Sequence, residues 1–83
     1  MKLTIETSNI EDLEKALRTL VVSLEEKAKG HIHANYSWLE KNGRNGKVEV
    51  VFYYSGENRA TDWIIRKEFE KAVKRIDSFA KIR

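Results

Sequence analysis

The chain has 83 residues, of which 41% are hydrophobic and 35% are charged, and its formal net charge at pH 7 is +3. This length has room for one core, so we expect a single small domain over residues 1–83. The sequence contains no cysteine, which excludes disulfides, thiolate metal sites and a cysteine nucleophile. No apolar run approaches the roughly 18 residues of a membrane span. We therefore expect no signal peptide, no transmembrane helix and no membrane partner, and we interpret the chain as soluble and cytoplasmic.

The positive charge is concentrated toward the C-terminal end. Residues 59–83 carry eight Lys or Arg against four Asp or Glu, whereas residues 1–30 carry five against six and residues 31–58 carry three against three. Such an asymmetry indicates an acidic partner, of which nucleic acid is the commonest.

The first part of the chain changes from a period of two to a helical period. Apolar and polar residues alternate in residues 2–6, which predicts a strand with one buried face. Ser8 and Glu11 form a capping box, which predicts the start of a helix. Apolar residues then recur at helical spacing as far as Ala28, and Gly30 is expected to end the helix.

Residues 31–55 have the pattern of a β-hairpin. Apolar and polar residues alternate on both sides of the turn sequence NGRNG at residues 42–46. If Trp38 and Val50 both face the core, the numbers of paired residues must sum to an even value, and we predict a sum of about 88. The predicted opposite pairs are His33 and Ser55, Asn35 and Tyr53, Ser37 and Val51, and Leu39 and Glu49.

The rest of the chain predicts one more helix. The sequence SGEN at residues 55–58 should end the hairpin, and the helix is expected from about Ala60 to near the C-terminus. Its apolar stripe comprises Ile65, Phe69, Ala72, Val73, Ile76, Phe79 and Ala80. A right-handed crossover then gives an α+β two-layer sandwich with the element order β-α-β-β-α. We predict a three-stranded mixed sheet in the order 1-3-2 with both helices on one face, which resembles a truncated ferredoxin-like fold.

His31 and His33 are the candidates for metal binding. They lie on one side of a predicted strand, about 6.6 Å apart. A zinc site needs at least one more protein ligand, for which Glu57 is the only obvious candidate, so we expect two ordinary histidines, no metal and no cofactor. The sequence also lacks a nucleophile elbow, a phosphate-binding glycine loop and a dinucleotide fingerprint. We therefore expect no catalytic residue and a protein that is not an enzyme.

Nucleic-acid binding is the leading functional hypothesis, and the sequence offers two surfaces for it. On the open face of the sheet, Tyr53 and His33 could stack on unpaired bases beside Asn35. On the last helix, the candidate binding residues are Trp63, Lys67, Lys71, Lys74 and Arg75. These two surfaces point away from each other if the helix packs on the covered face of the sheet.

Both surfaces also have ordinary structural explanations. Glu70 with Lys74 and Asp77 with Lys81 are i,i+4 pairs typical of a solvated helix, and Trp63 could cover the end of a small core.

Protein association is the alternative function. The first strand should lie at one edge of the sheet and the strand that carries His33 and Asn35 at the other. An uncovered edge or sheet face can pair with a second copy or with another protein, such as an acidic one. The absence of proline and cysteine together with Lys/Glu-rich helices is also typical of thermophile and designed proteins. A designed chain without a biological function is therefore a further alternative.

Overall fold

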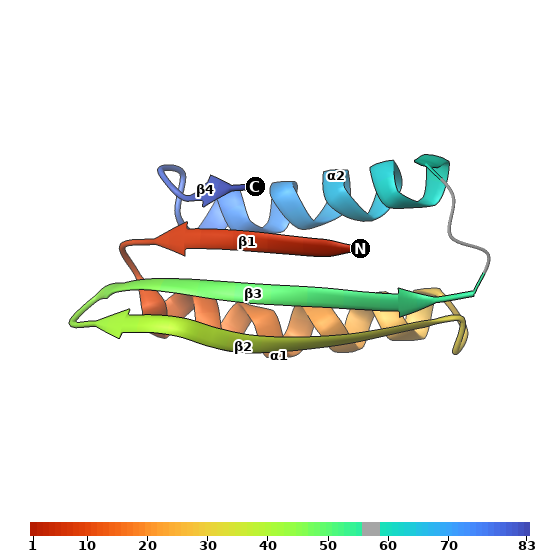
Figure 1. Ribbon diagram of the computed structural model, residues 1–83, viewed down its shortest axis with the longest axis horizontal. Coiled ribbons are helices and arrows are strands. Elements are labelled where there is room, and N and C mark those ends of the chain that lie inside the picture. Colours follow the sequence, from red (N-terminus) through yellow and green to blue (C-terminus); the bar gives the residue numbers. More distant parts are fainter. Residues whose placement is uncertain (56–58) are drawn as a thin grey trace.

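The computed structural model describes residues 1–55 and 59–83. Its elements in chain order are β1 (Lys2–Thr7), α1 (Ile10–Lys27), β2 (Ile32–Asn42), β3 (Asn45–Tyr54), α2 (Arg59–Ile76) and β4 (Lys81–Ile82). These strands form one sheet in the order β2-β3-β1-β4, and both helices lie on the same side of it (Figure 1). Most of the predicted SGEN break, residues 56–58, lies outside the described residues.

The two-layer α+β architecture is confirmed, and the first three strands keep the predicted order 1-3-2, but the sheet has a fourth strand and is not mixed, so the predicted three-stranded mixed sheet is wrong. Every neighbouring pair of strands is antiparallel. The hairpin places β3 between β1 and β2 and reverses its direction relative to both. A fourth strand, β4, pairs with β1 at Ile5 and Ile82. Two backbone hydrogen bonds of 2.9 Å between Thr4 and Arg83 extend this pairing. β2 is therefore one edge of the sheet, as predicted, and the other edge is β4 and not β1.

The last helix ends at Ile76, well before the predicted position. The carboxylate of Asp77 accepts hydrogen bonds from the hydroxyl of Thr7 and from the N–H of Phe79. These bonds hold the chain in a turn that leads into β4. Phe79 was predicted for the apolar stripe, but this turn leaves it 88% exposed, whereas Ala80 is buried.

The hairpin register differs by two residues from the predicted one. Asn35 pairs with Val51, so the paired numbers sum to 86 along most of β2. The turn is tighter than predicted, with only Gly43 and Arg44 between the strands, and the pairs beside it sum to 87. Between Trp38 and Glu40, an irregularity at Leu39 adds one residue to β2. The paired numbers therefore sum to 87 near the turn and to the even value of 86 from Trp38 back to Ile32. The apolar residues of both strands therefore still face the helices.

The start of α1 also differs from the predicted capping box. Asn9 is the N-cap, and its side chain accepts a hydrogen bond of 3.3 Å from the N–H of Asp12. Ser8 instead donates its N–H to Asp77 at 3.1 Å. At the other end, the cap residue is Ala28, and the left-handed residue directly after it is Lys29, with φ of 53°, and not the predicted Gly30. Gly30 follows Lys29 and also has a positive φ, of 82°.

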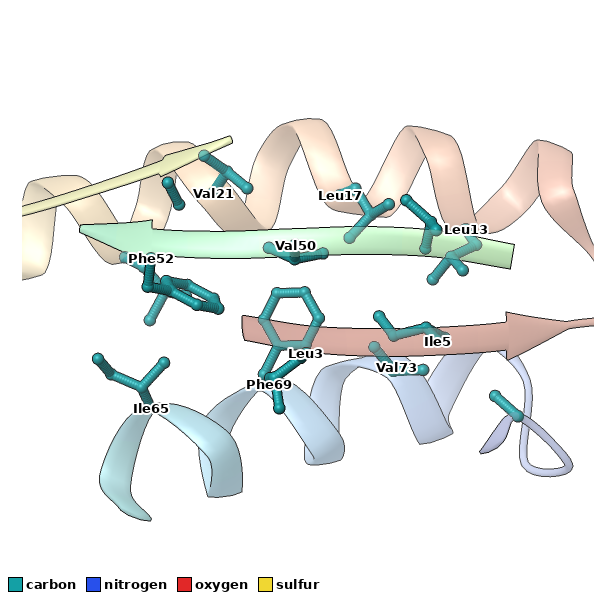
Figure 2. Packing of buried hydrophobic residues seen from close by; sticks show 14 residues of the cluster. Leu3, Ile5, Leu13, Leu17, Val21, Val50, Phe52, Ile65, Phe69 and Val73 are labelled. Carbon is teal, nitrogen blue, oxygen red and sulfur yellow. The ribbon is translucent and has the colours of Figure 1, made fainter. Parts of the chain in front are cut away.

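The hydrophobic core lies between the helices and the two central strands. Figure 2 shows side chains of α1 and α2 converging on β1 and β3. The rings of Phe52 and Phe69 meet edge to face, with centres 5.6 Å apart and an interplanar angle of 86°. The largest fully buried side chains are Leu3, Ile5, Leu13, Leu17, Val48, Val50, Phe52, Phe69 and Val73. The alternate residues of the strands point to the other face, which no helix covers.

Candidate functional site

The uncovered face of the sheet is the first candidate surface. His33 pairs with Tyr53 across β2 and β3, and their ring centres are 6.4 Å apart with an angle of 27° between the rings. Asn35 follows on β2, opposite Val51. The predicted pairing of Asn35 with Tyr53 is thus wrong. The three candidate residues nevertheless share one face, because a shift of two residues preserves the side on which a residue lies.

Ion pairs occupy much of the same face. Lys2 lies 3.8 Å from Glu49, and Lys47 lies 3.7 Å from Glu6. Exposed pairs of this kind contribute only about 0–1 kcal/mol to stability. The pairs matter more for binding than for stability, because a phosphate group that approaches Lys2 or Lys47 also meets the carboxylate of Glu49 or Glu6. This face therefore offers aromatic surface without an excess of positive charge.

The imidazole of His33 is tied to α1. Its Nδ1 lies 3.1 Å from Oε1 of Glu25, and the same oxygen accepts a hydrogen bond of 3.0 Å from the N–H of Ala34. The sequence did not single out Glu25 among the glutamates of α1. The signal that could have found it is the short connection between α1 and β2, which brings the last turns of the helix beside the start of the strand.

The metal candidates do not form a cluster in the structure. In residues 1–55 and 59–83, no three His, Cys, Asp or Glu side chains gather so that they could hold a metal ion. Glu57, the third ligand that the sequence suggested, lies outside these ranges. Neither helix in the described part of the chain has the length and apolar composition needed to cross a membrane.

The outward side of α2 is the second candidate surface. Trp63 is 62% exposed and Ile64 is 56% exposed, although both are large and apolar. The Nζ of Lys67 lies 5.4 Å from the centre of the Trp63 ring, which is a cation–π distance. Together with Glu68 and Lys71, these residues line a shallow groove. The exposure of Trp63 rules out the alternative that it covers the end of the core.

Two further cations continue this surface along α2. Lys71 and Arg75 follow Lys67 at four-residue steps, and both are exposed. Within the described ranges, no carboxylate lies within 4.0 Å of the charged groups of these three side chains. We call Trp63, Lys67, Lys71 and Arg75 the α2 row. All four were predicted from helical spacing, which fixes the outward side of an amphipathic helix.

Lys74, the fifth predicted residue of this helix, has a different role. Its Nζ donates hydrogen bonds to the carbonyl oxygens of Ala80 and Ser78. A lysine at the end of a helix commonly satisfies free carbonyl groups in this way. Lys74 is therefore engaged by the turn that leads to β4.

The predicted i,i+4 pairs of this helix do not form. Glu70 pairs with Arg66, whose Nε lies 3.0 Å from Oε1, and not with Lys74. Asp77 lies beyond the end of the helix and is bonded to Thr7, so it does not pair with Lys81. Among the residues that the structure describes, Glu70 is therefore the only acidic residue of α2 that forms an ion pair.

Comparison with known proteins shows the fold but not the function. No family model matches the chain, and no curated protein matches it in sequence. Among solved structures it is similar to "De novo designed protein Foldit4", with a TM-score of 0.75 and 10% sequence identity. The match covers 99% of this chain and 87% of that chain. At such low identity the similarity shows the fold alone. A designed sequence therefore also adopts this fold.

Proposed function

We propose that the protein is a small, non-enzymatic module that binds nucleic acid through the α2 row. The observation that carries this proposal is the exposed Trp63 beside a line of cations that have no carboxylate partner among the described residues. Successive members of the line Lys67, Lys71 and Arg75 are about 6 Å apart along the helix axis.

The chemistry of the row favours a single strand over a duplex. An exposed indole can stack on an unpaired base, which contributes about 1–3 kcal/mol per base, whereas the bases of a duplex are already stacked. The cations bind phosphates and release counterions. Three such contacts predict a slope of about −2 for the logarithm of the binding constant against the logarithm of salt concentration, because each contact on a single strand adds about −0.7.

The α2 row is a better candidate than the open sheet face, where His33, Asn35 and Tyr53 lie. On that face the lysines are paired with Glu49 and Glu6, and His33 is held by Glu25. A strand bound there would gain stacking on Tyr53 but little net attraction for its phosphates. We therefore assign these three residues no part in the proposed binding.

The test is fluorescence anisotropy of labelled mixed-sequence oligonucleotides, single-stranded and double-stranded, over a series of salt concentrations. We expect the single strand to bind more tightly, with affinity that falls as salt increases. Lys71→Glu should weaken binding strongly, and Trp63→Ala should weaken it about 5-fold to 150-fold, as loss of one stacked base implies. The matched control is Lys15→Glu, which makes the same charge change on the exposed side of α1.

Two outcomes would reject the proposal. One is a flat titration at low salt with folded protein. The other is an equal loss of affinity for Lys71→Glu and Lys15→Glu, which would show that only the net charge of the protein matters.

A second candidate is a designed chain that encodes a fold and no ligand. The observation that favours it is the structural similarity to a de novo designed protein, together with the absence of proline and cysteine. Such a chain predicts the flat titration described above for every oligonucleotide. The same anisotropy series therefore separates the two candidates.

A further inference from the structure

The strand β2 has an exposed edge that is covered by a side chain at one point. On its other side β2 pairs with β3. The N–H of Ala34 donates to Oε1 of Glu25 at 3.0 Å, so it points away from β3. Because the direction of hydrogen bonding alternates along a strand, the N–H and C=O of Tyr36 point to the same edge. No hydrogen bond from the described residues reaches the backbone of Tyr36 at this edge.

The usual protection of an edge strand is missing from this part of β2. Natural edge strands carry charges, prolines or bulges that prevent pairing with another chain. From Ile32 to Trp38, β2 contains no Lys, Arg, Asp, Glu or Pro. The irregularity comes only at Leu39, and Lys41 lies beyond it with its Nζ 5.5 Å from the centre of the Trp38 ring. The carboxylate that covers the edge comes from another element, α1.

We propose that the edge of β2 is a strand-pairing surface for a second copy of this chain, and that Glu25 keeps it closed. Two β2 strands can pair antiparallel about a twofold axis at Tyr36. This places Ala34 opposite the partner's Trp38, so each Ala34 N–H is needed for the new ladder. Glu25 and a second copy therefore compete for the same backbone donor.

A second copy fits this edge better than an unrelated strand does. Twofold pairing uses the same edge from both molecules and needs no separate complementary surface. Asn35 would face the partner's Ser37, so small polar groups meet on the open face and no like charges lie opposite each other. On the helix side, the half-buried rings of Tyr36 and Trp38 would lose their remaining contact with water.

The test is light scattering coupled to size-exclusion chromatography over a range of protein concentrations. We expect the wild-type protein to be a monomer and Glu25→Ala to form a dimer whose fraction rises with concentration. Glu25→Gln should stay monomeric, because its amide oxygen can still accept the Ala34 hydrogen bond. The matched control Glu26→Ala removes a neighbouring exposed carboxylate and should also stay monomeric.

A second substitution identifies the surface. Adding Tyr36→Pro to Glu25→Ala should restore the monomer, because proline removes an N–H that points outward and leaves the bonds to β3 in place. A Glu25→Ala protein that stays monomeric at high concentration would overturn the proposal. So would a wild-type dimer, or a Glu25→Ala dimer that persists with Tyr36→Pro.

Amide hydrogen exchange on the wild-type protein provides a measurement that does not depend on the folding of any variant. The N–H of Ala34 should exchange more slowly than the N–H of Tyr36, because only the former is bonded at the edge. Equal exchange rates would show that Glu25 does not cover the edge in solution, and the proposal would then be wrong.

Discussion

The hydroxyl of Thr7 donates a hydrogen bond of 2.7 Å to Oδ2 of Asp77, which joins the end of β1 to the chain just after α2. Both residues are buried. The N–H groups of Ser8 and Phe79 donate to the same carboxylate at 3.1 and 3.0 Å. The hydrogen bond from Thr7, supported by those from Ser8 and Phe79, holds the pKa of Asp77 below its ordinary value, although burial acts in the opposite direction.

This carboxylate should make stability depend on pH in the acid range. A group whose pKa is lowered in the folded state contributes stability above its unfolded pKa, about 3.9 for Asp, and loses it as pH falls through the folded pKa. We expect Asp77→Asn to lower the free energy of unfolding at pH 7 by about 1–3 kcal/mol, because buried donors lose a charged acceptor. Below pH 4 the difference between variant and wild type should shrink. Urea unfolding at pH 7, 5, 4 and 3 measures both effects.

The control for Asp77 is Glu68→Gln, which neutralises an exposed carboxylate on α2. Its free energy of unfolding should follow the wild-type pH profile closely. Parallel profiles for Asp77→Asn and the wild type would contradict the assigned role of Asp77.

The two phenylalanines near the C-terminal end should differ sharply in their effect on stability. Phe69 is fully buried against Phe52, and truncation to alanine is expected to cost about 3–5 kcal/mol. Phe79 is 88% exposed, so Phe79→Ala should change the free energy of unfolding by less than about 0.5 kcal/mol. Thermal or urea unfolding of both variants is sufficient. A large loss for Phe79→Ala would mean that the helix continues past Ile76.

Lys74 and Lys71 should separate stability from binding. Lys74→Met removes the donor to the carbonyls of Ser78 and Ala80, and we expect a loss of about 0.5–1.5 kcal/mol of stability with little change in oligonucleotide affinity. Lys71→Met should leave stability nearly unchanged and weaken binding. Unfolding curves and anisotropy on the same two proteins provide the comparison. Equal effects on affinity would argue against the separate role of Lys74.

Gly46 is expected to resist substitution because of its neighbours. A Cβ atom there would lie 2.6 Å from Cγ1 of Ile10 and 2.9 Å from Cζ3 of Trp38. We expect Gly46→Ala to destabilise the protein by about 1–3 kcal/mol through overpacking. Ser37→Ala, on the exposed face of β2, is the control and should be nearly neutral. A neutral Gly46→Ala would indicate that the side chains of Ile10 and Trp38 both move aside freely.

The sequence by itself determined the five main elements and the faces that they bury. The alternation in β1, β2 and β3 and the helical spacing in α1 and α2 are local patterns, and burial of one face is what produces them. The same reasoning placed Trp63, Lys67, Lys71 and Arg75 on the outward side of α2. It also kept His33, Asn35 and Tyr53 on one face, although the register was wrong by two residues.

Only the tertiary structure decided where α2 ends, how the sheet is completed and which charges are engaged. Asp77 ends the helical run because it bonds to Thr7, 70 residues earlier. The strand β4 has two residues, too few to show any alternation. Glu25 reaches the edge of β2 from α1. A contact between residues distant in sequence produces no periodic pattern along the chain. The sequence around each of the two residues is the same whether or not the contact forms, so a local pattern does not reveal it.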